Sequence, residues 1–294
     1  MTGITNSIHV ALCFDENFWA PAYATMRSVC LATKRRKDLV FHLCHTRLAA
    51  AQIADLESIG GEFGATLRHY DPAQAEPYRR LAATMAHTKY LPAIMYARLL
   101  FADLLDPGID RLVYLDCDLL VRAPIEELAG LDLEGKPLGA VKEPHALRFS
   151  NGRDANERRD LFDPADAFFN SGVLLIDLEA WRARDIPAML RRLESGGVLP
   201  RLSNDQEVLN HLFKHDWQEI ERSWNSLAAS RAIEMLDPKI VHYTGPNKPW
   251  NLVSGLPFAR IYRHVMTNDL FYRYLRFRWA RYWTGGASRP PGPG

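Results

Sequence analysis

The sequence lacks the short motifs that assign many chains to a common class of protein. Its four cysteines form no Cys-x-x-Cys pair, which argues against a zinc knuckle and a thioredoxin-type redox site. It has neither the Gly-x-Gly-x-x-Gly fingerprint of a dinucleotide site nor the Gly-Lys-Ser/Thr of a phosphate loop. Dinucleotide-dependent enzymes and phosphate-loop ATPases are therefore disfavoured.

Charge of one sign and long apolar runs are also missing. The 294 residues include 36 Lys and Arg against 35 Asp and Glu, a balance that argues against a nucleic-acid partner. No apolar run approaches the roughly 18 residues of a membrane span. The first residues show no basic region followed by an apolar core, as a signal peptide would. We expect a soluble, cytoplasmic protein.

The sequence does contain a regular alternation of strand-like and helix-like segments. Strands are predicted at residues 8–14, 39–44, 66–70, 111–115, 139–141, 168–176 and 239–243. Helices are predicted at residues 21–33, 49–59, 91–105, 178–183, 187–195 and 203–213, the second of them stopped by Gly60-Gly61. Residues 72–87 are predicted to form an irregular polar loop, and residues 148–166 a charged surface excursion. The alternation predicts an α/β fold with a mostly parallel sheet.

Two aspartates follow the predicted strand 111–115 directly. Asp116 and Asp118 project to the same side of an extended segment, and two like charges placed so close together favour a cation between them. Carboxylate oxygens suit Mg²⁺ or Mn²⁺, and open α/β sheets bind ligands outside the carboxyl ends of their strands. The alternative interpretation is a pair of solvated aspartates in a turn.

Polar residues also follow the first and the last predicted strands. Asp15 and Asn17 are suited to a base or ribose edge, although helix capping also explains Asn17. His242 lies at the end of the last strand, and a lone strand histidine is often structural. Gly245 and Lys248 follow in a loop, where glycine lets a ligand approach the backbone and lysine can meet a phosphate. Together with the acidic pair, these residues favour a metal–diphosphate site.

Six segments in this order resemble the family 8 glycosyltransferases, retaining enzymes that include bacterial lipopolysaccharide galactosyl- and glucosyltransferases and glycogenin. The likeness covers roughly residues 8 to 252 and is greatest to the lipopolysaccharide α-galactosyltransferase type. The segments are Phe14-Asp-Glu-Asn17, Tyr96-Ala-Arg-Leu99, Val113-Tyr-Leu-Asp-Cys-Asp118, Phe169-Asn-Ser-Gly-Val-Leu-Leu175, Asn204-Asp-Gln206 and His242-Tyr-Thr-Gly-Pro-Asn-Lys-Pro-Trp250.

The resemblance implies a GT-A fold, which is a Rossmann-like, mostly parallel mixed sheet flanked by helices. It implies UDP-galactose or UDP-glucose as donor, a saccharide acceptor such as a lipopolysaccharide core, and Mn²⁺ (or Mg²⁺) bound by Asp116, Asp118 and His242. Phe14 and Cys117 belong to the same motifs and are expected at the donor site, where Phe18 would stack on the base held by Asp15 and Asn17. Lys248 and the Gly245 backbone would bind the diphosphate. The remaining contacts to the donor sugar and diphosphate would come from Arg98, Asn170, Asp205 and Gln206.

Retention leaves two mechanisms open. A double displacement needs a carboxylate close to the sugar C1, and Asp205 is the candidate, although its place in the first turn of a helix is also explained by the helix dipole. A same-face attack lets the leaving UDP accept the acceptor's proton. Gln206 is a poor nucleophile, so we favour same-face attack, with Gln206, Asp205 and Asp118 as the catalytic candidates.

Three other functions fit parts of the sequence. A haloacid-dehalogenase-type phosphatase also uses Asp-x-Asp after a strand, but that family places the pair near its first strand. A non-catalytic sugar-nucleotide-binding module would not need the metal set. A glycogenin-like self-glucosylating enzyme would add hexoses to its own tyrosines, of which the chain has 11.

The C-terminal region has a different composition. Residues 271–283 hold seven aromatic residues and four arginines but no acid. On a helix of about 100° per residue, one third of the circle collects Phe271, Tyr272, Leu275, Trp279, Tyr282 and Trp283. The helix therefore either binds a membrane surface or packs on the catalytic domain with its arginines outward. The resemblance favours an anchor on the cytoplasmic face of the inner membrane. We expect a catalytic domain at 1–255, this basic aromatic helical region at 256–284 and a disordered tail at 285–294.

Overall fold

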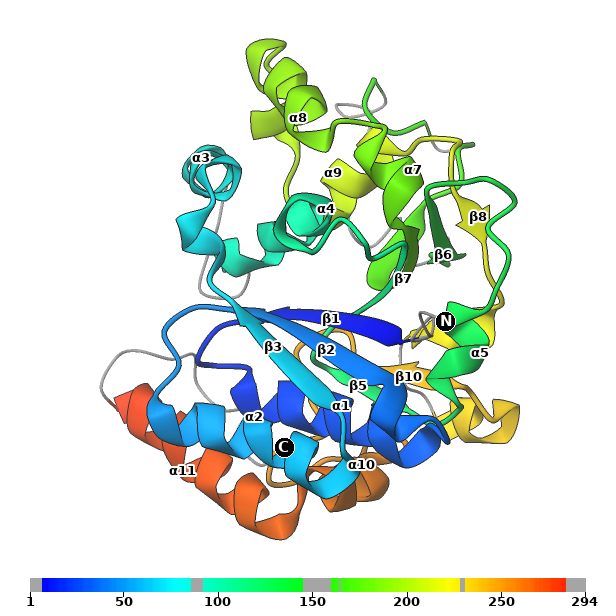
Figure 1. Cartoon of the computed structure of the whole chain (residues 1–294). Coiled ribbons are helices and arrows are strands. Elements are labelled where there is room, and N and C mark those ends of the chain that lie inside the picture. The colour runs from blue at the N-terminus through cyan, green and yellow to red at the C-terminus, as the bar shows by residue number, and fades with distance from the viewer. Residues whose placement is uncertain (1–6, 86–91, 145–159, 164, 228–230, 284–294) are drawn as a thin grey trace, which may run out of the picture.

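A seven-stranded sheet forms the centre of the molecule (Figure 1). The computed structural model describes residues 7–85, 92–144, 160–163, 165–227 and 231–283. The strand order is β3-β2-β1-β4-β7-β6-β8. The bounds are β1 Ile8–Phe14, β2 Leu39–His45, β3 Thr66–Tyr70, β4 Arg111–Leu115, β6 Leu138–Lys142, β7 Phe169–Asp177 and β8 Gln218–Glu219. Strands β1 to β4 run parallel, and β7 is antiparallel to both β4 and β6. The mixed, mostly parallel α/β sheet is the one predicted.

Helices cover both faces of this sheet. On one face lie α1 Trp19–Ala32, α2 Ala50–Phe63, α10 Ala259–Met266 and α11 Asn268–Trp283, and on the other α3 Glu76–Thr84, α4 Phe101–Leu104, α7 Leu178–Arg182, α8 Ile186–Ser195 and α9 Asp205–Leu212. The short helix α5 spans Ile125–Ala129, and 3₁₀ turns at Ala93–Leu100 and Arg222–Asn225 join neighbouring elements.

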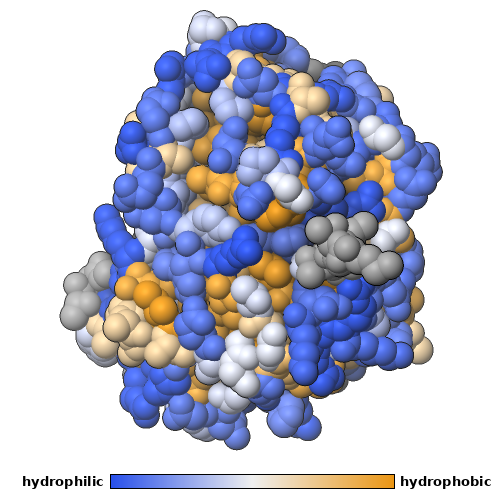
Figure 2. Space-filling view, in the orientation of Figure 1, coloured by the Kyte–Doolittle hydropathy of each residue, from blue (hydrophilic) through white to orange (hydrophobic). Residues whose placement is uncertain are grey.

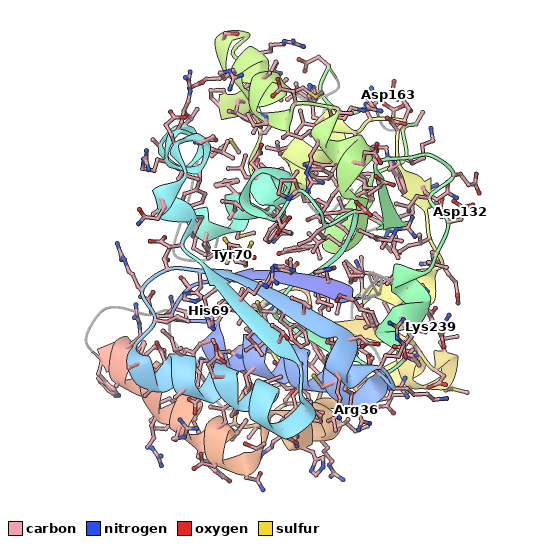
Figure 3. The ribbon with its side chains drawn as sticks, in the orientation of Figure 1. Arg36, His69, Tyr70, Asp132, Asp163 and Lys239 are labelled. Atoms are coloured by element: carbon pink, nitrogen blue, oxygen red, sulfur yellow. The ribbon has the colours of Figure 1, made fainter. Side chains whose placement is uncertain are left out.

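The side-chain alternation of β1 explains the two layers. Val10 and Leu12 belong to the core shared with α1 and α2, whereas Ala11 and Cys13 belong to the core shared with α3 and α9. Side chains fill the space on both sides of the sheet (Figure 3). Outside, apolar side chains are seen in smaller patches between hydrophilic ones on the face in Figure 2. Within the described residues, no helix is long and apolar enough to cross a membrane.

A smaller three-stranded sheet lies beside the carboxyl end of β4. Its strands are β5 Leu119–Val121, β10 Ile240–His242 and β9 Ser226–Leu227, in the order β5-β10-β9. The antiparallel register sets His242 opposite Leu119. This pairing carries the last strand of the chain back to the aspartates that follow β4.

Two local predictions are wrong. Helix α2 does not stop at Gly60-Gly61 but continues to Phe63 and ends at Gly64, whose φ of 74° is the left-handed conformation that favours glycine at a helix end. The predicted polar loop at 72–87 contains helix α3, because Tyr78 and Leu81 bury one face of it against the core. Tertiary packing here overrides a weak local pattern.

Some predicted segments lie outside the described residues. The surface excursion at 148–166 does so for the most part, although Leu161 and Phe162 at its end are described and are buried. The tail at 285–294 lies outside entirely.

The C-terminal helices α10 and α11 pack on the core formed by β1 and α1. Leu270, Phe271 and Tyr274 of α11 are buried in the same cluster as Trp19 of α1, and the Tyr274 hydroxyl donates to the Asn17 carbonyl at 2.7 Å. Phe271, at the start of the predicted aromatic stripe, therefore packs against the rest of the chain, which is the second of the two alternatives for this helix. The end of the helix is more exposed, with Trp279 at 49 % and Trp283 at 80 %.

Candidate metal and donor site

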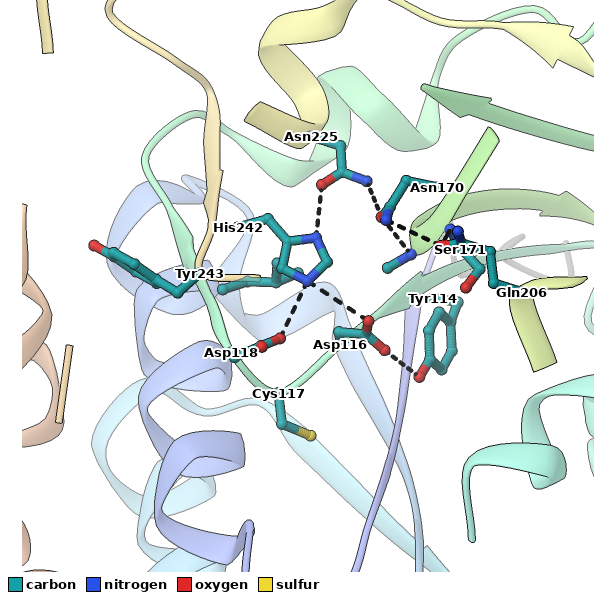
Figure 4. A network of polar contacts seen from close by, with 12 residues as sticks. Tyr114, Asp116, Cys117, Asp118, Asn170, Ser171, Gln206, Asn225, His242 and Tyr243 are labelled. Carbon is teal, nitrogen blue, oxygen red and sulfur yellow. Dashed lines mark hydrogen bonds and ion pairs between the residues drawn. The ribbon is translucent and has the colours of Figure 1, made fainter. Parts of the chain in front are cut away.

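Asp116, Asp118 and His242 meet at the carboxyl end of β4 (Figure 4). The His242 Nε2 lies 3.2 Å from an Asp118 oxygen and 3.7 Å from an Asp116 oxygen. One ligand atom from each residue lies within 4.8 Å of the other two. The two aspartates come from the end of one strand and the histidine from another, more than a hundred residues later in the chain.

Gly172 on β7 has no side chain, and this leaves room for the cluster. A Cβ added at Gly172 would lie 2.8 Å from an Asp116 oxygen and 2.8 Å from the His242 Nδ1. Real Cβ atoms essentially never come so close to another heavy atom. The glycine in the Asn-Ser-Gly segment is therefore required by sterics at the site.

Arg98 is a buried cation between two carboxylates. Its guanidinium lies 2.8 Å from Asp116 and 3.0 Å from Asp205 and stacks 4.4 Å from the centre of the Tyr114 ring. Burial disfavours its charge, but the two aspartates outweigh burial and raise the pKa of Arg98 well above its usual value. Burial raises the pKa of Asp205, an effect that Arg98 opposes.

Lys248 is bound to the acidic pair. Its ammonium donates to Asp118 and to the Tyr243 carbonyl, both at 2.6 Å. Burial alone would raise the pKa of Asp118, yet Lys248 and His242 together hold it well below its usual range. Asp118 is thus an ionised carboxylate. Gly245, in the same loop, has a φ of 84°, which a side chain would disfavour.

The Asn170 and Gln206 side chains lie against the same edge. Asn170 Nδ2 and the Ser171 backbone N–H both donate to the Gln206 side-chain oxygen Oε1, at 3.0 and 3.1 Å. The Gln206 amide donates in turn to Glu143 at 3.4 Å. Helix α9, capped by the Asn204 side chain on the Glu207 N–H, holds Gln206 and Asp205 in its first turn.

The loop after β1 is folded on itself. Asp15 accepts hydrogen bonds from the Asn17 backbone N–H at 2.8 Å and from its side chain at 3.0 Å, and burial raises the pKa of Asp15. The Phe18 ring meets Trp250 edge-on with centroids 5.9 Å apart. This loop therefore lies beside the one that carries Lys248.

Two predicted donor-site residues do not offer a side chain to a ligand. Phe14 is 2 % exposed. The thiol of Cys117 is 5 % exposed and lies 3.5 Å from the Cys13 carbonyl. Both residues belong to the hydrophobic core.

Sequence reasoning missed two residues of the site. Tyr114 donates to Asp116 at 2.8 Å, and its spacing of two residues along β4 could have revealed that it shares a face with Asp116. Asn225 lies 2.9 Å from the His242 Nδ1 and is 2 % exposed. Asn225 stands in a 3₁₀ turn outside every segment that pointed to the site, so no local pattern marks it.

A mostly parallel α/β sheet with an acidic pair at the carboxyl end of β4 and a histidine brought to it by a smaller sheet is the arrangement expected of a GT-A glycosyltransferase. The chain belongs to glycosyl transferase family 8, whose family model matches residues 9–253. The predicted family and enzyme class, a hexosyltransferase, are confirmed.

Relatives of known function agree with this class. The chain is 25 % identical to the lipopolysaccharide 1,3-galactosyltransferase of Salmonella typhimurium over 90 % of this chain and 79 % of that protein. It is 25 % identical to the lipopolysaccharide 1,2-glucosyltransferase of Escherichia coli, over 88 % of this chain and 78 % of that protein. The chain is 24 % identical to general stress protein A of Bacillus subtilis, over 88 % of this chain and 93 % of that protein.

Solved structures share the fold. The galactosyltransferase LgtC in complex with donor and acceptor sugar analogues superposes with a TM-score of 0.70 at 25 % identity, covering 88 % of this chain and 95 % of that one. An active-site mutant of LgtC gives a TM-score of 0.71 at 24 % identity with the same coverage.

Proposed function

We propose that this protein transfers galactose or glucose from a UDP-sugar to a saccharide acceptor with retention, in a Mn²⁺-dependent reaction. The observation that carries the proposal is the cluster of Asp116, Asp118 and His242 with Lys248 beside it. Breaking a sugar–phosphate bond builds negative charge on the leaving diphosphate, and this edge of the sheet is where the chain can place cations against it.

The residues fit a divalent cation. Two carboxylates and one imidazole suit Mn²⁺, with Mg²⁺ as the alternative, and the absent Cβ of Gly172 keeps the three ligand atoms close. A cation bound there would neutralise the charge of the diphosphate as UDP leaves.

The chain's own residues have separate roles in this proposal. Asp15 and Asn17 hold the base and ribose, and Phe18 stacks on the base. Lys248 turns from Asp118 toward the diphosphate, assisted by the Gly245 backbone. Arg98 is 4 % exposed, so it would act on the donor only indirectly, by orienting Asp116 and Asp205.

Same-face attack is the mechanism that the burial of Asp205 favours. Its carboxylate is 2 % exposed and paired with Arg98, so it is poorly placed to reach a sugar carbon. The Gln206 oxygen already accepts two hydrogen bonds, which suits an orienting amide rather than a nucleophile. In a same-face attack the leaving diphosphate accepts the proton of the acceptor hydroxyl.

We further propose a lipopolysaccharide-type acceptor, from the names of the relatives. A lipid-linked acceptor would bring the protein to a membrane surface. The exposed Trp279 and Trp283 at the end of α11, next to Arg278 and Arg281, are the residues suited to such a surface.

The test is UDP release from a panel of UDP-sugars, with Mn²⁺ and with EDTA. We expect slow hydrolysis of one UDP-hexose that EDTA abolishes and that Asp118→Ala reduces at least about 100-fold. Asp132→Ala, which removes an exposed acid far from the site (Figure 3), is the control and should match wild type. Metal-independent release, or none with any donor, would refute the proposal.

A further inference from the structure

A chain of side-chain amides leads from His242 to Gln206. His242 Nδ1 lies 2.9 Å from Asn225 Oδ1, and Asn225 Nδ2 donates to Asn170 Oδ1 at 2.8 Å. Asn170 Nδ2 donates to Gln206 Oε1 at 3.0 Å. His242, Asn225 and Asn170 are all less than 9 % exposed, so water competes little for these bonds.

Two backbone N–H groups fix the direction of every bond in this chain. The Gly172 N–H donates to the Asn170 side-chain oxygen at 3.0 Å, and the Ser171 N–H donates to the Gln206 oxygen at 3.1 Å. A backbone N–H can only donate. The Asn170 oxygen therefore faces Asn225, which must present its NH₂ group there and its oxygen to His242.

The irregular register of β7 makes these two N–H groups available. Ala140 of β6 pairs with Leu174, but the next residue, Val141, pairs with Asn170. Residues 171–173 therefore have no partner residue on β6, and Ser171 and Gly172 turn their N–H groups to side chains instead. Such irregularities are common beside active sites.

We propose that Asn225 is a positioning residue that fixes neutral His242 in its Nδ1–H tautomer, leaving the Nε2 lone pair directed at the metal position between Asp116 and Asp118. The proposal rests on the metal site of the proposed function. It gives a specific role to the amide chain, because the partner of the distal nitrogen sets which nitrogen of a histidine binds metal.

The first test is Mn²⁺ affinity without donor, measured by titration followed by electron paramagnetic resonance. Asn225→Leu removes the acceptor and should weaken Mn²⁺ binding about 10- to 100-fold. Asn225→Asp keeps an oxygen acceptor on His242 but loses the donor to Asn170, so it should retain more Mn²⁺ affinity than Asn225→Leu. Asn210→Leu is the matched control. Asn210 is also buried, and its side chain on α9 hydrogen-bonds the Phe169 backbone on β7, so this variant should be less stable than wild type but bind Mn²⁺ with the same affinity.

The second test reads the tautomer directly in protein saturated with Mg²⁺, the diamagnetic alternative to Mn²⁺, because without a cation the Asp118 carboxylate 3.2 Å from Nε2 would attract the ring proton. Long-range ¹H–¹⁵N spectra of the histidine rings should show Nδ1–H for His242 in wild type and a mixture of tautomers in Asn225→Leu. An Nε2–H ring in wild type would overturn the proposal, as would unchanged Mn²⁺ affinity and tautomer in folded Asn225→Leu.

These readouts separate the proposal from the proposed function. Wild type that binds Mn²⁺ and shows the Nδ1–H ring but releases UDP from no donor would refute the function and leave the role of Asn225 intact. Wild type that binds neither Mn²⁺ nor Mg²⁺ would refute the metal assignment and, with it, the role of Asn225.

Discussion

At the scale of single residues, Lys248 and the proposed metal ion would compete for Asp118. The ammonium lies 2.6 Å from one Asp118 oxygen, so a cation that binds this carboxylate must share it or displace the lysine. We predict that Lys248→Ala binds Mn²⁺ alone several-fold more tightly than wild type, while UDP release falls about 10²–10³-fold because a charge is missing from the leaving group.

Separate titrations of Mn²⁺ and of UDP-sugar turnover check this prediction. Lys248→Arg retains the positive charge and should recover part of the turnover. A parallel loss of metal affinity and turnover in Lys248→Ala would show that the lysine supports the metal rather than the diphosphate.

Gly172 gives a second prediction at this scale. Gly172→Ala places a methyl group against Asp116 and His242, so we expect Mn²⁺ affinity and UDP release to fall at least about tenfold, as for other changes that misplace metal ligands. Gly61→Ala is the control, because nothing lies within 4 Å of its added Cβ and it lies inside α2. It should leave activity unchanged and stabilise the fold by about 0.5–1 kcal/mol. Full activity in Gly172→Ala would contradict the close packing seen here.

At the scale of elements, the first turn of α9 is fastened to β4 through Arg98. The Arg98 guanidinium pairs with the carboxylates of Asp205 and Asp116. The Arg98 and Asp205 side chains are both nearly inaccessible to solvent. Asp205→Asn should lower the free energy of unfolding by about 3–5 kcal/mol, because it removes one partner of a buried ion pair. Urea unfolding measures this loss.

Asp269→Asn is the control for this prediction. Asp269 pairs with Arg273 on the surface of α11, its side chain is 78 % exposed, and its loss should cost less than about 1 kcal/mol. Near-equal stability of the two variants would mean that the Asp205–Arg98 ion pair does not stabilise the packing of α9 against β4. A sugar–Asp205 adduct found by mass spectrometry would then restore double displacement.

At the scale of the whole molecule, a row of histidines across the first three strands makes stability depend on pH. His42 lies between His9 and Tyr70 at 2.9 Å from each and is fully buried, with His69 and Tyr70 at the end of β3 (Figure 3). Burial, then His9 and Arg68, lowers the pKa of His42 to about 3.

The sign of the effect follows from linkage. Because the folded protein keeps His42 neutral while the unfolded chain takes up a proton below its ordinary pKa of 6.5, this stabilisation is complete above pH 6.5 and is lost as the pH falls toward 3. At pH 5 the loss from His42 is about 2 kcal/mol. Urea unfolding between pH 8 and pH 5 should show a smaller loss in His42→Gln, whereas His264→Gln, on the surface of α10, should behave as wild type.

Local sequence patterns were enough to predict the alternation of strands and helices and a cation site at the acidic pair after β4, whereas His242 was assigned as the third ligand only through the resemblance to the family. The alternation and the cation site follow from local chemistry. Val113 to Leu115 and Ile240 to Val241 are apolar runs that must be buried, and each ends in polar residues. Ligands bind outside the carboxyl ends of strands in open α/β sheets, so the polar residues after β4 are predicted well, whereas the meeting with His242 depends on the pairing of β10 with β5.

The residues that orient these candidates, and the extent of two helices, became known only from the folded chain. Asn225 and Gly172 matter because the register of β7 and the pairing of β10 bring them against His242. Helix α3 forms because distant elements bury Tyr78 and Leu81. Such contacts join residues far apart in the chain, and their free energy depends on packing geometry that no local pattern of residue types contains.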